Sequence, residues 1–582
     1  MEEKKVLLSI KDLEVKFRVR GRILTAIRGV DLDVYDGESI AIVGESGSGK
    51  SVFTKTFAGM LDSNGFISNG HIIFSDDDLA DTSVLMKKSD WNWVTYCHKQ
   101  LNTYSKLEAG AEIYRQLLDL EKEKKEKAGL SEESRGEFEA RIADLTFNKV
   151  EASNLKQTLD PSKDKKRIKE ISAQISELEK QIKAVEVERD ATIRSHKAAA
   201  NSDREYLATY VKRKAELTRA YSEAVSGEIS SEIAARNLIL AKEIYLSVGR
   251  FGFRARIRTL KKLLKAFRKA MQLGVDLDNE NERNGVFDSV VFRVQYLDET
   301  PEKLHGTCIL NLAKIKYSKD WTQIRGGKIA TVFQDPMTSL NPIITIGKQI
   351  TSIIIKHQHC SEAEARSRAL VLMKKVGIPN AENRFDDYPF QYSGGMRQRI
   401  VIAIALSCQP KVLICDEPTT ALDVTIQAQI LKLLKDLQKE FGFTIVFITH
   451  DLGVVANVAD RVAVMYAGQI VELGTVEEVF YDPRHPYTWA LLSSLPQLAQ
   501  RNTKLYSITG TPPSLYNKIV GDPFAPRNPY CLKIDTLMDS PMFRVTDTHF
   551  AKTWMLDPRA PKIEKPEIIQ DIHQKLMDAF NI

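Results

Sequence analysis

The sequence has few cysteines, and they lie far apart. Six occur in 582 residues, and no two of them form a C-x-x-C pair. The six are Cys97, Cys308, Cys360, Cys408, Cys415 and Cys531. This spacing indicates neither a zinc site nor a disulfide framework, so we expect a protein of a reducing compartment.

Long apolar stretches are missing as well. No run approaches the roughly 20 residues that a membrane-spanning helix needs, and Met1–Lys5 lacks the apolar core of a signal peptide. If the protein works at a membrane, we therefore expect a peripheral subunit. The net charge of +6 is too small to argue for nucleic acid. With 43% hydrophobic and 27% charged residues, the composition is that of a soluble protein of several domains.

A glycine-rich loop is the first informative feature that the sequence does contain. The apolar run Ile40–Val43 leads into Gly44–Ser51, which has the spacing G-x-x-x-x-G-K-[ST], and Val52–Leu61 has a helical pattern. The backbone N–H groups of such a loop point at a phosphate, and the helix N-terminus adds partial positive charge. Lys50 can reach the β- and γ-phosphates, and the Ser51 hydroxyl can ligate Mg²⁺. The alternative is a chance glycine-rich turn, against which the later motifs argue.

Two strands are expected before this loop and one after it. Residues 6–18 alternate apolar and polar side chains, and Ile23–Val34 is expected to pair with them in antiparallel fashion. Phe17, near the end of the first strand, can stack on adenine, although a buried core position is the commoner role of a strand aromatic. Ile67–Phe74 is expected to form a further short strand.

Between residues 80 and 324 the sequence becomes rich in Lys, Glu, Ala and Ser. A seam of apolar residues at spacings of three and four predicts a helix over about 164–196, roughly 50 Å long. The seam consists of Ile168, Ile171, Ile175, Leu178, Ile182 and Val185. A second periodic segment is Leu207–Val225. We expect the two to form an antiparallel hairpin, with an intermolecular coiled coil as the alternative.

The stretch Arg250–Lys269 is strongly basic and contains no acidic residue. Its leucines fall at helical spacing, so it predicts a basic amphipathic helix, which can lie on anionic lipid or bind nucleic acid. A solvated face packed on an acidic neighbour is the alternative. Val286–Tyr296 and Thr307–Ile315 are expected to be strands that close the insertion.

Two later apolar strands end in polar residues that suit ATP hydrolysis. Lys328–Phe333 precedes Gln334, which can ligate Mg²⁺ and orient a water molecule, although surface glutamines are common. Val412–Cys415 precedes Asp416 and Glu417. Asp416 suits Mg²⁺ held through water, and Glu417 suits a general base beside the γ-phosphate.

Two further segments complete the set of motifs. Tyr392–Arg399 is a polar glycine turn that leads into the apolar helix Ile400–Ser407, and it predicts a second anion-binding helix N-terminus. The strand Thr444–Ile448 precedes His450. A single histidine at a strand end is usually structural, but this one accompanies the other motifs.

Together these motifs closely resemble those of the ATP-binding cassette (ABC) family, and each occurs once, in that family's order. The matching segments are Walker A at Gly44–Ser51, the Q-loop residue Gln334, the signature Ser393–Met396, Walker B at Val412–Asp416 with Glu417 after it, Asp423 of the D-loop and the switch residue His450. Longer strings are similar to the dipeptide/oligopeptide/nickel importer subfamily, and within it to the OppD/DppD type of ATP-binding subunit. These strings are Phe333–Pro342, Ser393–Arg399, Ala421–Ile430, His485–Thr488 and Gly510–Leu515.

The resemblance covers about 1–79 and 325–530 and implies an α/β P-loop NTPase fold. The expected nucleotide-binding domain has a RecA-like lobe, an antiparallel β lobe and a helical signature lobe. It is interrupted by a large, mainly α-helical, coiled-coil-like insertion. The expected domains are 1–79 and 325–490 for the two parts of the nucleotide-binding domain, 80–324 for the insertion and 491–582 for a C-terminal extension.

The resemblance also implies ATP and Mg²⁺ as cofactors and gives the residues their roles. Catalytic roles fall to Glu417, His450, Gln334 and Lys50, and metal binding falls to Ser51, Gln334 and Asp416. The residues implied to contact the nucleotide are Gly44, Glu45, Ser46, Gly47, Ser48, Gly49, Lys50, Ser51, Val52 and Phe17, with Ser393, Gly394, Gly395 and Asp423 contributed across a pair of subunits. The implied partners are a second ABC ATPase, usually a paralogue, two transmembrane permease subunits and an extracytoplasmic substrate-binding protein. The implied location is the cytoplasmic face of the membrane.

Three features depart from the subfamily's pattern. Tyr392 stands where leucine is usual, and the insertion precedes Gln334, where relatives have a short connection. The subfamily's tail commonly carries four cysteines that look like iron–sulfur ligands. Here the aligned positions hold Asp522, Asn528, Asp535 and Thr553, and Cys531 is out of register. Since such a cluster usually needs four thiolates, we expect none.

A different class of function is a soluble ABC ATPase with a coiled coil that acts on DNA or ribosomes. In such DNA-repair proteins the coil enters after the Q-loop and is far longer, and a translation factor would need two cassettes. The insertion here lies before Gln334, and a single set of motifs is present. We therefore expect an importer ATPase that does not bind nucleic acid.

Overall fold

The computed structural model describes most of the chain. The residues not described are 1–4, 76–80, 130–133, 139–140, 143, 147, 150–151, 153–163, 250–251, 288–291, 301, 316–320, 323, 421, 495–507, 509, 517–518, 567–568 and 571–582. Three residues named above, Met1, Arg250 and Ala421, lie outside the described residues.

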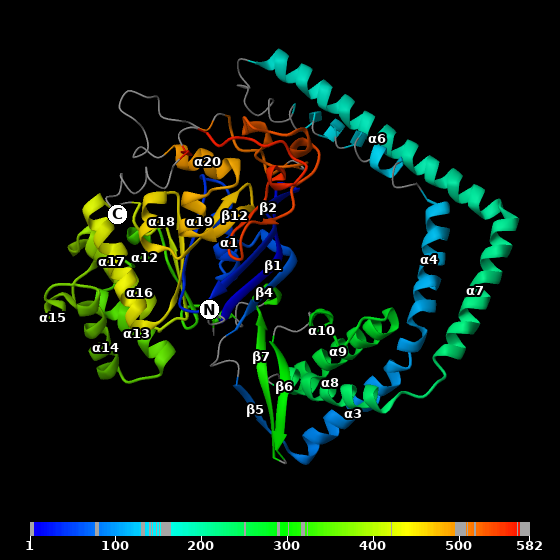
Figure 1. Cartoon of the computed structure of the whole chain (residues 1–582), viewed down its shortest axis with the longest axis horizontal. Coiled ribbons are helices and arrows are strands. Elements are labelled where there is room, and N and C mark those ends of the chain that lie inside the picture. The colour runs from blue at the N-terminus through cyan, green and yellow to red at the C-terminus, as the bar shows by residue number, and fades with distance from the viewer. Residues whose placement is uncertain are drawn as a thin grey trace. The chain divides into compact units, whose positions relative to one another are not determined.

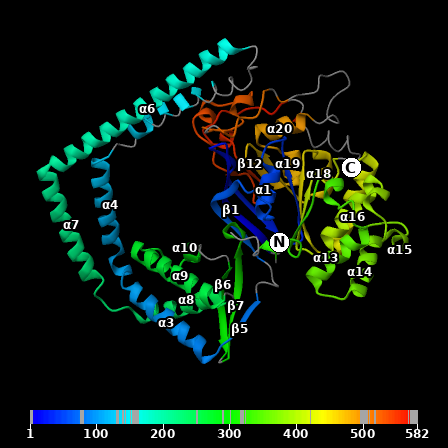
Figure 2. The same cartoon turned by 180° about the vertical axis from the view of Figure 1, so that it is seen from behind.

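The chain forms two compact units (Figures 1 and 2). The first, which we call the cassette, holds Met1–Ser83, Val291–Leu297 and His305–Ile582. The second, which we call the lobe, holds Val84–Val290 and Asp298–Leu304. After Val291–Leu297, the chain makes its final return to the cassette at residue 305, earlier than the boundary at 325 expected from the sequence.

A largely parallel sheet forms the centre of the cassette, with the strand order β13-β14-β12-β11-β3-β10-β9-β8. The parallel strands are β3 (Ser39–Val43), β8 (Ile329–Val332), β9 (Val412–Asp416), β10 (Thr444–Thr449) and β11 (Arg461–Tyr466). They are apolar and buried along nearly their whole length, as expected for strands covered on both faces. Because parallel strands end at the same edge, the motif residues that follow β3, β8, β9 and β10 meet there.

An antiparallel sheet lies in the order β2-β1-β4-β7-β5, with β6 beside β7. Its first strands are β1 (Val6–Val19), β2 (Arg22–Tyr35) and β4 (Gly65–Phe74), and β1 pairs with the other two in antiparallel fashion, which confirms the prediction for the first pair. The chain passes between the units within β5 (Asp81–Leu85), β6 (Phe292–Thr300) and β7 (Lys303–Asn311).

The segment after β7 belongs to the cassette core, although the sequence placed it in the insertion. Leu310 of β7 lies opposite Phe74 of β4. Leu310, Leu312, Trp321 and Ile324 are buried in the same hydrophobic cluster as β1 and β3. Long-range pairing therefore sets the boundary, and local composition does not reveal it.

Helices cover the central sheet and form a helical subdomain beside it. Those of the cassette are α1 (Lys50–Phe57), α12 (Pro336–Ser339), α13 (Ile346–Gln358), α14 (Glu362–Lys375), α15 (Ala381–Arg384), α16 (Gly394–Leu406), α17 (Val424–Phe441), α18 (Leu452–Val458), α19 (Val476–Tyr481) and α20 (Pro486–Ser493). The C-terminal extension adds β14 (Phe550–Ala551) beside β12 (Gln469–Thr475) and β13 (Phe543–Arg544) beside β14. The extension is thus built onto the cassette's own sheet.

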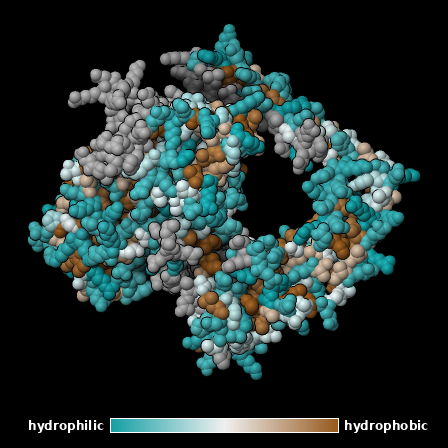
Figure 3. Space-filling model, in the orientation of Figure 1, coloured by the Kyte–Doolittle hydropathy of each residue, from teal (hydrophilic) through white to brown (hydrophobic). Residues whose placement is uncertain are grey.

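The described secondary structure of the lobe is mainly helical. Its helices are α3 (Lys88–Ser105), α4 (Ala111–Lys127), α6 (Lys165–Ser202), α7 (Arg204–Ala224), α8 (Ser231–Gly249), α9 (Phe253–Leu273) and α10 (Glu280–Val286). Helix α3 packs on α8 and α9. On the face seen in Figure 3, the side chains along α6 are mainly hydrophilic.

The long helices pair differently from the sequence prediction. Helix α7 lies alongside α4, in antiparallel fashion, as Figures 1 and 2 both show: Tyr221 packs near Tyr114, Lys214 bonds to Glu121, and Asp203 bonds to Lys127. Helix α6 bonds to the segment after α4, through the ion pairs Lys149–Glu179 at 2.7 Å and Arg141–Glu188 at 3.0 Å.

The expected hairpin of α6 with α7 is therefore wrong. Only Asp203 separates the two helices, and it caps α7 by accepting a bond from the Tyr206 N–H. A single residue is too short for a helix to fold back on its predecessor. Of the predicted seam, Ile171 and Val185 are buried, and the other four residues are half-buried.

The predicted basic helix is confirmed as α9, which starts at Phe253. Its apolar stripe packs inside the lobe, with Leu260, Leu263 and Phe267 fully buried. The exposed basic residues are Arg254, Arg258, Lys261, Lys262, Lys265, Arg268 and Lys269. Apart from Arg268, which lies over the Tyr104 ring, they form no ion pair or ring contact with a described residue.

Candidate nucleotide-binding and catalytic site

A cavity of about 530 Å³ opens beside the glycine-rich loop and the strand ends of the cassette. Side chains of β1 and β2 form its apolar side, and the loop and the acidic strand ends form its polar side. The lining residues are Phe17, Val19, Leu24, Ala26, Ser46, Gly47, Gly49, Lys50, Ser51, Val52, Asp62, Gln334, Asp416, Glu417 and Leu515. The cavity thus brings together most of the residues predicted to hold the nucleotide and its metal. It also includes Asp62, which lies in no motif, and Leu515, which ends the string Gly510–Leu515 but to which the sequence assigns no role at the nucleotide.

Two glycines of the loop occupy conformations and spaces that other residues cannot. Gly44 has a φ of 155°, and a Cβ there would lie 2.1 Å from the Met465 carbonyl oxygen. Gly49, just before α1, has a φ of 101°, and a Cβ there would lie 3.1 Å from the Ala26 carbonyl oxygen. The loop therefore fits closely against its neighbours only because these positions lack side chains.

Lys50 holds the loop from inside. Its Nζ donates to the carbonyl oxygens of Gly44 at 2.7 Å and Glu45 at 3.0 Å. Burial lowers the pKa of the ammonium group, while the nearby carboxylates of Glu417, Asp416 and Glu45 act in the opposite direction. A triphosphate in the cavity can take over the ammonium's hydrogen bonds, because phosphate oxygens are stronger acceptors than carbonyls.

Ser51 and Asp416 lie together at the position expected for the metal. The Ser51 hydroxyl donates to Asp416 Oδ1 at 3.2 Å, and burial raises the pKa of the Asp416 carboxyl. A hydroxyl and a carboxylate supply the hard oxygen ligands that Mg²⁺ prefers, so these residues fit the ion. Gln334, the third predicted ligand, instead donates from Nε2 to Glu417 Oε2 at 3.1 Å.

Glu417 is the centre of a hydrogen-bonded group at the strand ends. Its carboxylate accepts from Gln334 and from the Thr420 hydroxyl, both at 3.1 Å, and lies 3.2 Å from His450 Nδ1. Its backbone is left-handed, with a φ of 46°, and its N–H donates to the Ile448 carbonyl oxygen. Such a strained position persists only where the surroundings fix it, as at catalytic sites. Thr420 was not assigned a role from the sequence.

The signature and D-loop residues do not line this cavity. Ser393 and Asp423 cap the N-termini of α16 and α17 through their own side chains, and both residues are exposed. Gly394 is exposed and Gly395 half-buried on the first turn of α16. Tyr392, which replaces leucine, is buried, and its hydroxyl donates to the Arg384 carbonyl oxygen at 2.7 Å.

The four tail residues at the positions of the subfamily's cysteines are buried, and their side-chain oxygens accept hydrogen bonds from backbone N–H groups. Asp522 accepts from the Phe524 N–H, Asn528 from Tyr530, Asp535 from Leu532 and Thr553 from Met555. No thiolate stands at any of them, so the donor set does not fit an iron–sulfur cluster. Within the described ranges, no group of three or more His, Cys, Asp or Glu side chains could hold a metal ion.

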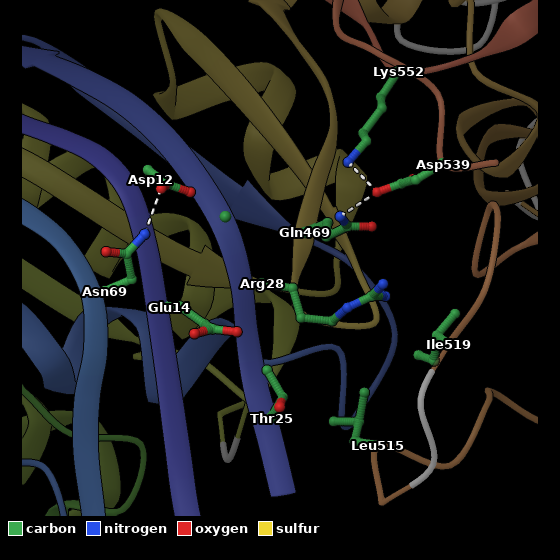
Figure 4. A pocket seen from close by; sticks show the side chains of 11 residues that line it. Asp12, Glu14, Thr25, Arg28, Asn69, Gln469, Leu515, Ile519, Asp539 and Lys552 are labelled. Carbon is green, nitrogen blue, oxygen red and sulfur yellow. Dashed lines mark hydrogen bonds and ion pairs between the residues drawn. The ribbon is translucent and has the colours of Figure 1, made fainter. Parts of the chain in front are cut away.

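A second cavity, of about 520 Å³, lies between β1, β2 and the C-terminal extension (Figure 4). Its charged residues include Glu14, Arg28, Asp539 and Lys552. Asp539 bonds to Lys552 at 2.8 Å and accepts from Gln469 at 2.9 Å, as the dashed lines in Figure 4 show. Acidic and basic groups alternate around this cavity, so its charge favours no single class of ligand.

A phosphate-binding loop, a serine beside a half-buried aspartate and a strand-end glutamate define a P-loop ATPase. The model of the family described as "ABC transporter" matches residues 27–232 and 289–420. The model described as "Oligopeptide/dipeptide transporter, C-terminal region" matches residues 471–534. The chain belongs to the ABC transporter family.

Curated relatives agree with this assignment. The oligopeptide transport ATP-binding protein AmiE of Streptococcus pneumoniae is 66% identical over 268 residues, which is 46% of this chain and 76% of AmiE. OppD of Bacillus subtilis, also an oligopeptide transport ATP-binding protein, is 59% identical over 263 residues, or 45% of this chain and 74% of OppD. The dipeptide transport ATP-binding protein DppD of Lactococcus lactis is 59% identical over 254 residues, or 44% of this chain and 72% of DppD.

The resemblance inferred from the motifs is thereby confirmed. The chain is an ABC ATPase that uses ATP with Mg²⁺, and it falls in the dipeptide/oligopeptide/nickel importer subfamily. In the part of the chain that the structure describes, no helix combines the length and the apolar character needed to cross a bilayer.

Proposed function

We propose that the chain is the ATP-hydrolysing subunit of a membrane importer for oligopeptides, or for dipeptides or nickel. The match of residues 471–534 to the model described as the C-terminal region of oligopeptide/dipeptide transporters carries this proposal. The relatives named as peptide transport proteins support it. Nothing in the described cassette favours the alternative of a DNA- or ribosome-associated ATPase.

The site geometry supports a division of labour among the cavity residues. Residues Gly44–Ser51 bind the phosphates, with Lys50 on the β- and γ-phosphates. Ser51 and Asp416 hold Mg²⁺, which when bound offsets the phosphate charge. Glu417 accepts a proton from the attacking water, because it is the carboxylate presented at the strand edge.

The remaining catalytic roles follow from contacts with Glu417. Gln334 and His450 both contact Glu417, so Gln334 would orient the water and offer its amide oxygen to the metal, and His450 would contact the γ-phosphate. Phe17 is only 8% exposed and packs in the core, but it also lines the cavity, so its stacking on adenine stays a prediction.

A second ABC ATPase completes the site. Ser393, Gly394, Gly395 and Asp423 reach no nucleotide in their own chain, yet Ser393 and Asp423 are exposed at helix N-termini that can bind an anion. We propose that they close over the ATP of a partner cassette, most simply a paralogue as is usual in this subfamily.

The cassette also offers a surface for the permeases. Met337, Ile343, Tyr388 and Phe390 are exposed apolar residues of two neighbouring segments, and Ile343 is 81% exposed. Arg397 links the segments by contacting both the Met337 sulfur and the Pro389 carbonyl oxygen. Exposed apolar groups of this kind indicate a protein interface, and their place next to Gln334 suits two transmembrane permease subunits that receive substrate from an extracytoplasmic binding protein. This surface supports the proposed location on the cytoplasmic face of the membrane.

The lobe has a separate role in this proposal, as an insertion that takes no part in ATP chemistry. Its exposed α9 cations support contact with anionic lipid headgroups, although the buried apolar stripe leaves only the charges available. The ion pairs of Glu179 and Glu188 on α6 support coiled-coil packing of this helix against the segment after α4. We keep the domains expected from the sequence, with an insertion between two parts of one cassette. The one change is that the second part of the cassette starts at residue 305 instead of 325.

Purification from membranes in mild detergent tests the importer proposal. We expect the chain to co-purify with two permeases and a second ABC ATPase, and we expect reconstituted vesicles to hydrolyse ATP faster when peptide and binding protein are added. Salt-sensitive retention on DNA or ribosomes, without permeases, would instead support the alternative.

A further inference from the structure

Glu45, in the phosphate-binding loop, has a partner for every one of its polar groups. Its N–H donates to the Tyr487 hydroxyl at 2.7 Å, and its carbonyl oxygen accepts from Lys50 Nζ at 3.0 Å. Its two carboxylate oxygens accept from the guanidinium of Arg527 at 2.6 and 3.1 Å. One residue of the loop therefore joins the phosphate-binding lysine to a residue of the C-terminal extension.

Arg527 is held firmly at the other end of this link. Its side chain is only 5% exposed and also donates to the Tyr466 hydroxyl at 3.2 Å. It ends the short turn Ala525–Arg527, next to Phe524, whose ring packs against Tyr466 and Tyr487 with centroids 5.3 Å away in each case. A bidentate, largely buried ion pair of this kind fixes the relative orientation of the two side chains and also neutralises their charges.

The extension approaches the nucleotide cavity at a second point. Leu515 lines the cavity together with Phe17 and the loop residues. Without Arg527, the Glu45 carboxylate would stand unpaired at the start of a loop that binds a triphosphate, and like charges at close range repel strongly where water is scarce.

We propose that the C-terminal extension is part of the ATP site, and that Arg527 is a positioning residue that sets the phosphate-binding loop through Glu45 and cancels its charge. The inference rests on the proposed role of Gly44–Ser51 in binding ATP and does not depend on the imported substrate. Arg527 does not line the nucleotide cavity, so its effect falls on ATP affinity more than on turnover.

The test compares the full-length chain with R527Q, R527K, E45Q and the double variant E45Q/R527Q. The matched control is R559Q, which removes an exposed arginine of the same extension. Equilibrium binding of ATP with Mg²⁺, the KM for ATP and kcat are measured for each, with thermal unfolding as a check on folding. If the unaltered chain fails to bind ATP, the proposed function is refuted. If the unaltered chain binds ATP, the variants test the role of Arg527 alone.

We expect R527Q to raise the Kd for ATP about tenfold, since one partner of a buried charge pair is left alone, while kcat changes less than about twofold. R527K keeps the positive charge but loses the second hydrogen bond to Glu45, so its Kd for ATP should lie between those of the unaltered chain and R527Q. The double variant should recover most of the affinity, because the unpaired carboxylate is gone. Wild-type affinity in R527Q, or a double variant no better than R527Q, would overturn the proposal.

Discussion

The cassette and the lobe differ in what fixes the position of their residues. In the cassette, each catalytic group follows a buried parallel strand, and strand pairing brings Gln334, Glu417 and His450 within hydrogen-bond distance. In the lobe, helix periodicity fixes which side of each helix is apolar and leaves the choice of partner open. Chemistry placed at sheet edges is therefore predictable from short motifs, whereas the packing of amphipathic helices depends on the lengths of the turns between them.

The largest effect is expected in the cassette cavity. E417Q should bind ATP but hydrolyse it at least about a hundredfold more slowly, because the phosphate loop survives and the general base does not. K50A should lose ATP binding itself, since it removes the buried ammonium group. Nucleotide affinity and steady-state hydrolysis, measured on the same preparations, separate the two. Wild-type turnover in E417Q would remove Glu417 from its role.

A smaller effect is expected at the basic face of the lobe. Changing Arg254, Arg258, Lys262 and Lys265 together to Glu should weaken binding to phosphatidylserine vesicles at least about tenfold, because each basic residue near an anionic bilayer contributes about 1 kcal/mol. Vesicles of phosphatidylcholine alone should bind neither form. The matched control reverses the exposed residues Lys183, Lys197, Lys212 and Arg213. If the control loses vesicle binding equally, or if the α9 variant loses none at low salt, the basic face of α9 is exposed to solvent and does not bind lipid.

The extension should show a pH-dependent effect. Burial raises the pKa of the Asp522 carboxyl to about 6, above its ordinary value of 3.8. Folding therefore favours the protonated carboxyl. The stability that this group contributes is fully present below pH 3.8, the ordinary pKa, and is lost as the pH rises through the folded-state pKa of about 6. D522N keeps the acceptor for Phe524 and should stabilise the chain by about 1 to 3 kcal/mol at about pH 8 and by nothing at about pH 4. Unfolding followed at both pH values tests this, with the exposed D547N as control.

Removing the lobe should change ATP chemistry little. The Met86 N–H donates to the Glu302 carbonyl oxygen at 2.8 Å, so a short Gly/Asn turn can replace residues 87–301 and join β5 directly to β7. This change removes β6, with residues 291–297 of the cassette, together with most of the lobe. We expect the shortened chain to bind and hydrolyse ATP within about twofold of the full chain, because loop closure depends weakly on length. A folded product that has lost hydrolysis would make the lobe part of the catalytic unit.

No effect of iron is expected anywhere. Because Asp522, Asn528, Asp535 and Thr553 offer oxygen atoms that already accept backbone hydrogen bonds, the extension should fold without a cluster. Anaerobic purification followed by iron and sulfide analysis measures this directly. Stoichiometric iron and sulfide would show that other ligands had been overlooked.

The sequence predicted the cavity well because its motifs are contiguous and each has one structural role. It did not reveal Thr420, Leu515 or Arg527, whose contacts join residues far apart in the chain. It also misplaced the end of the insertion, since the pairing of Leu310 with Phe74 has no local signature. The prediction of an α6–α7 hairpin was wrong for a related reason. Periodicity shows that one face of a helix is apolar, but only the one-residue turn at Asp203 and the contacts of α7 with α4 show which helix packs there.

The position of β3 in the central sheet has a consequence for how the protein is made. This strand pairs on one side with β10 and on the other with β11, so Val43 lies between Thr449 and Val464. A chain that emerges from the ribosome exposes the phosphate-binding loop long before those partners exist, whereas most contacts of the lobe are complete once β7 has been synthesised. The lobe therefore folds first, and the ATP site is assembled among the last parts of the molecule.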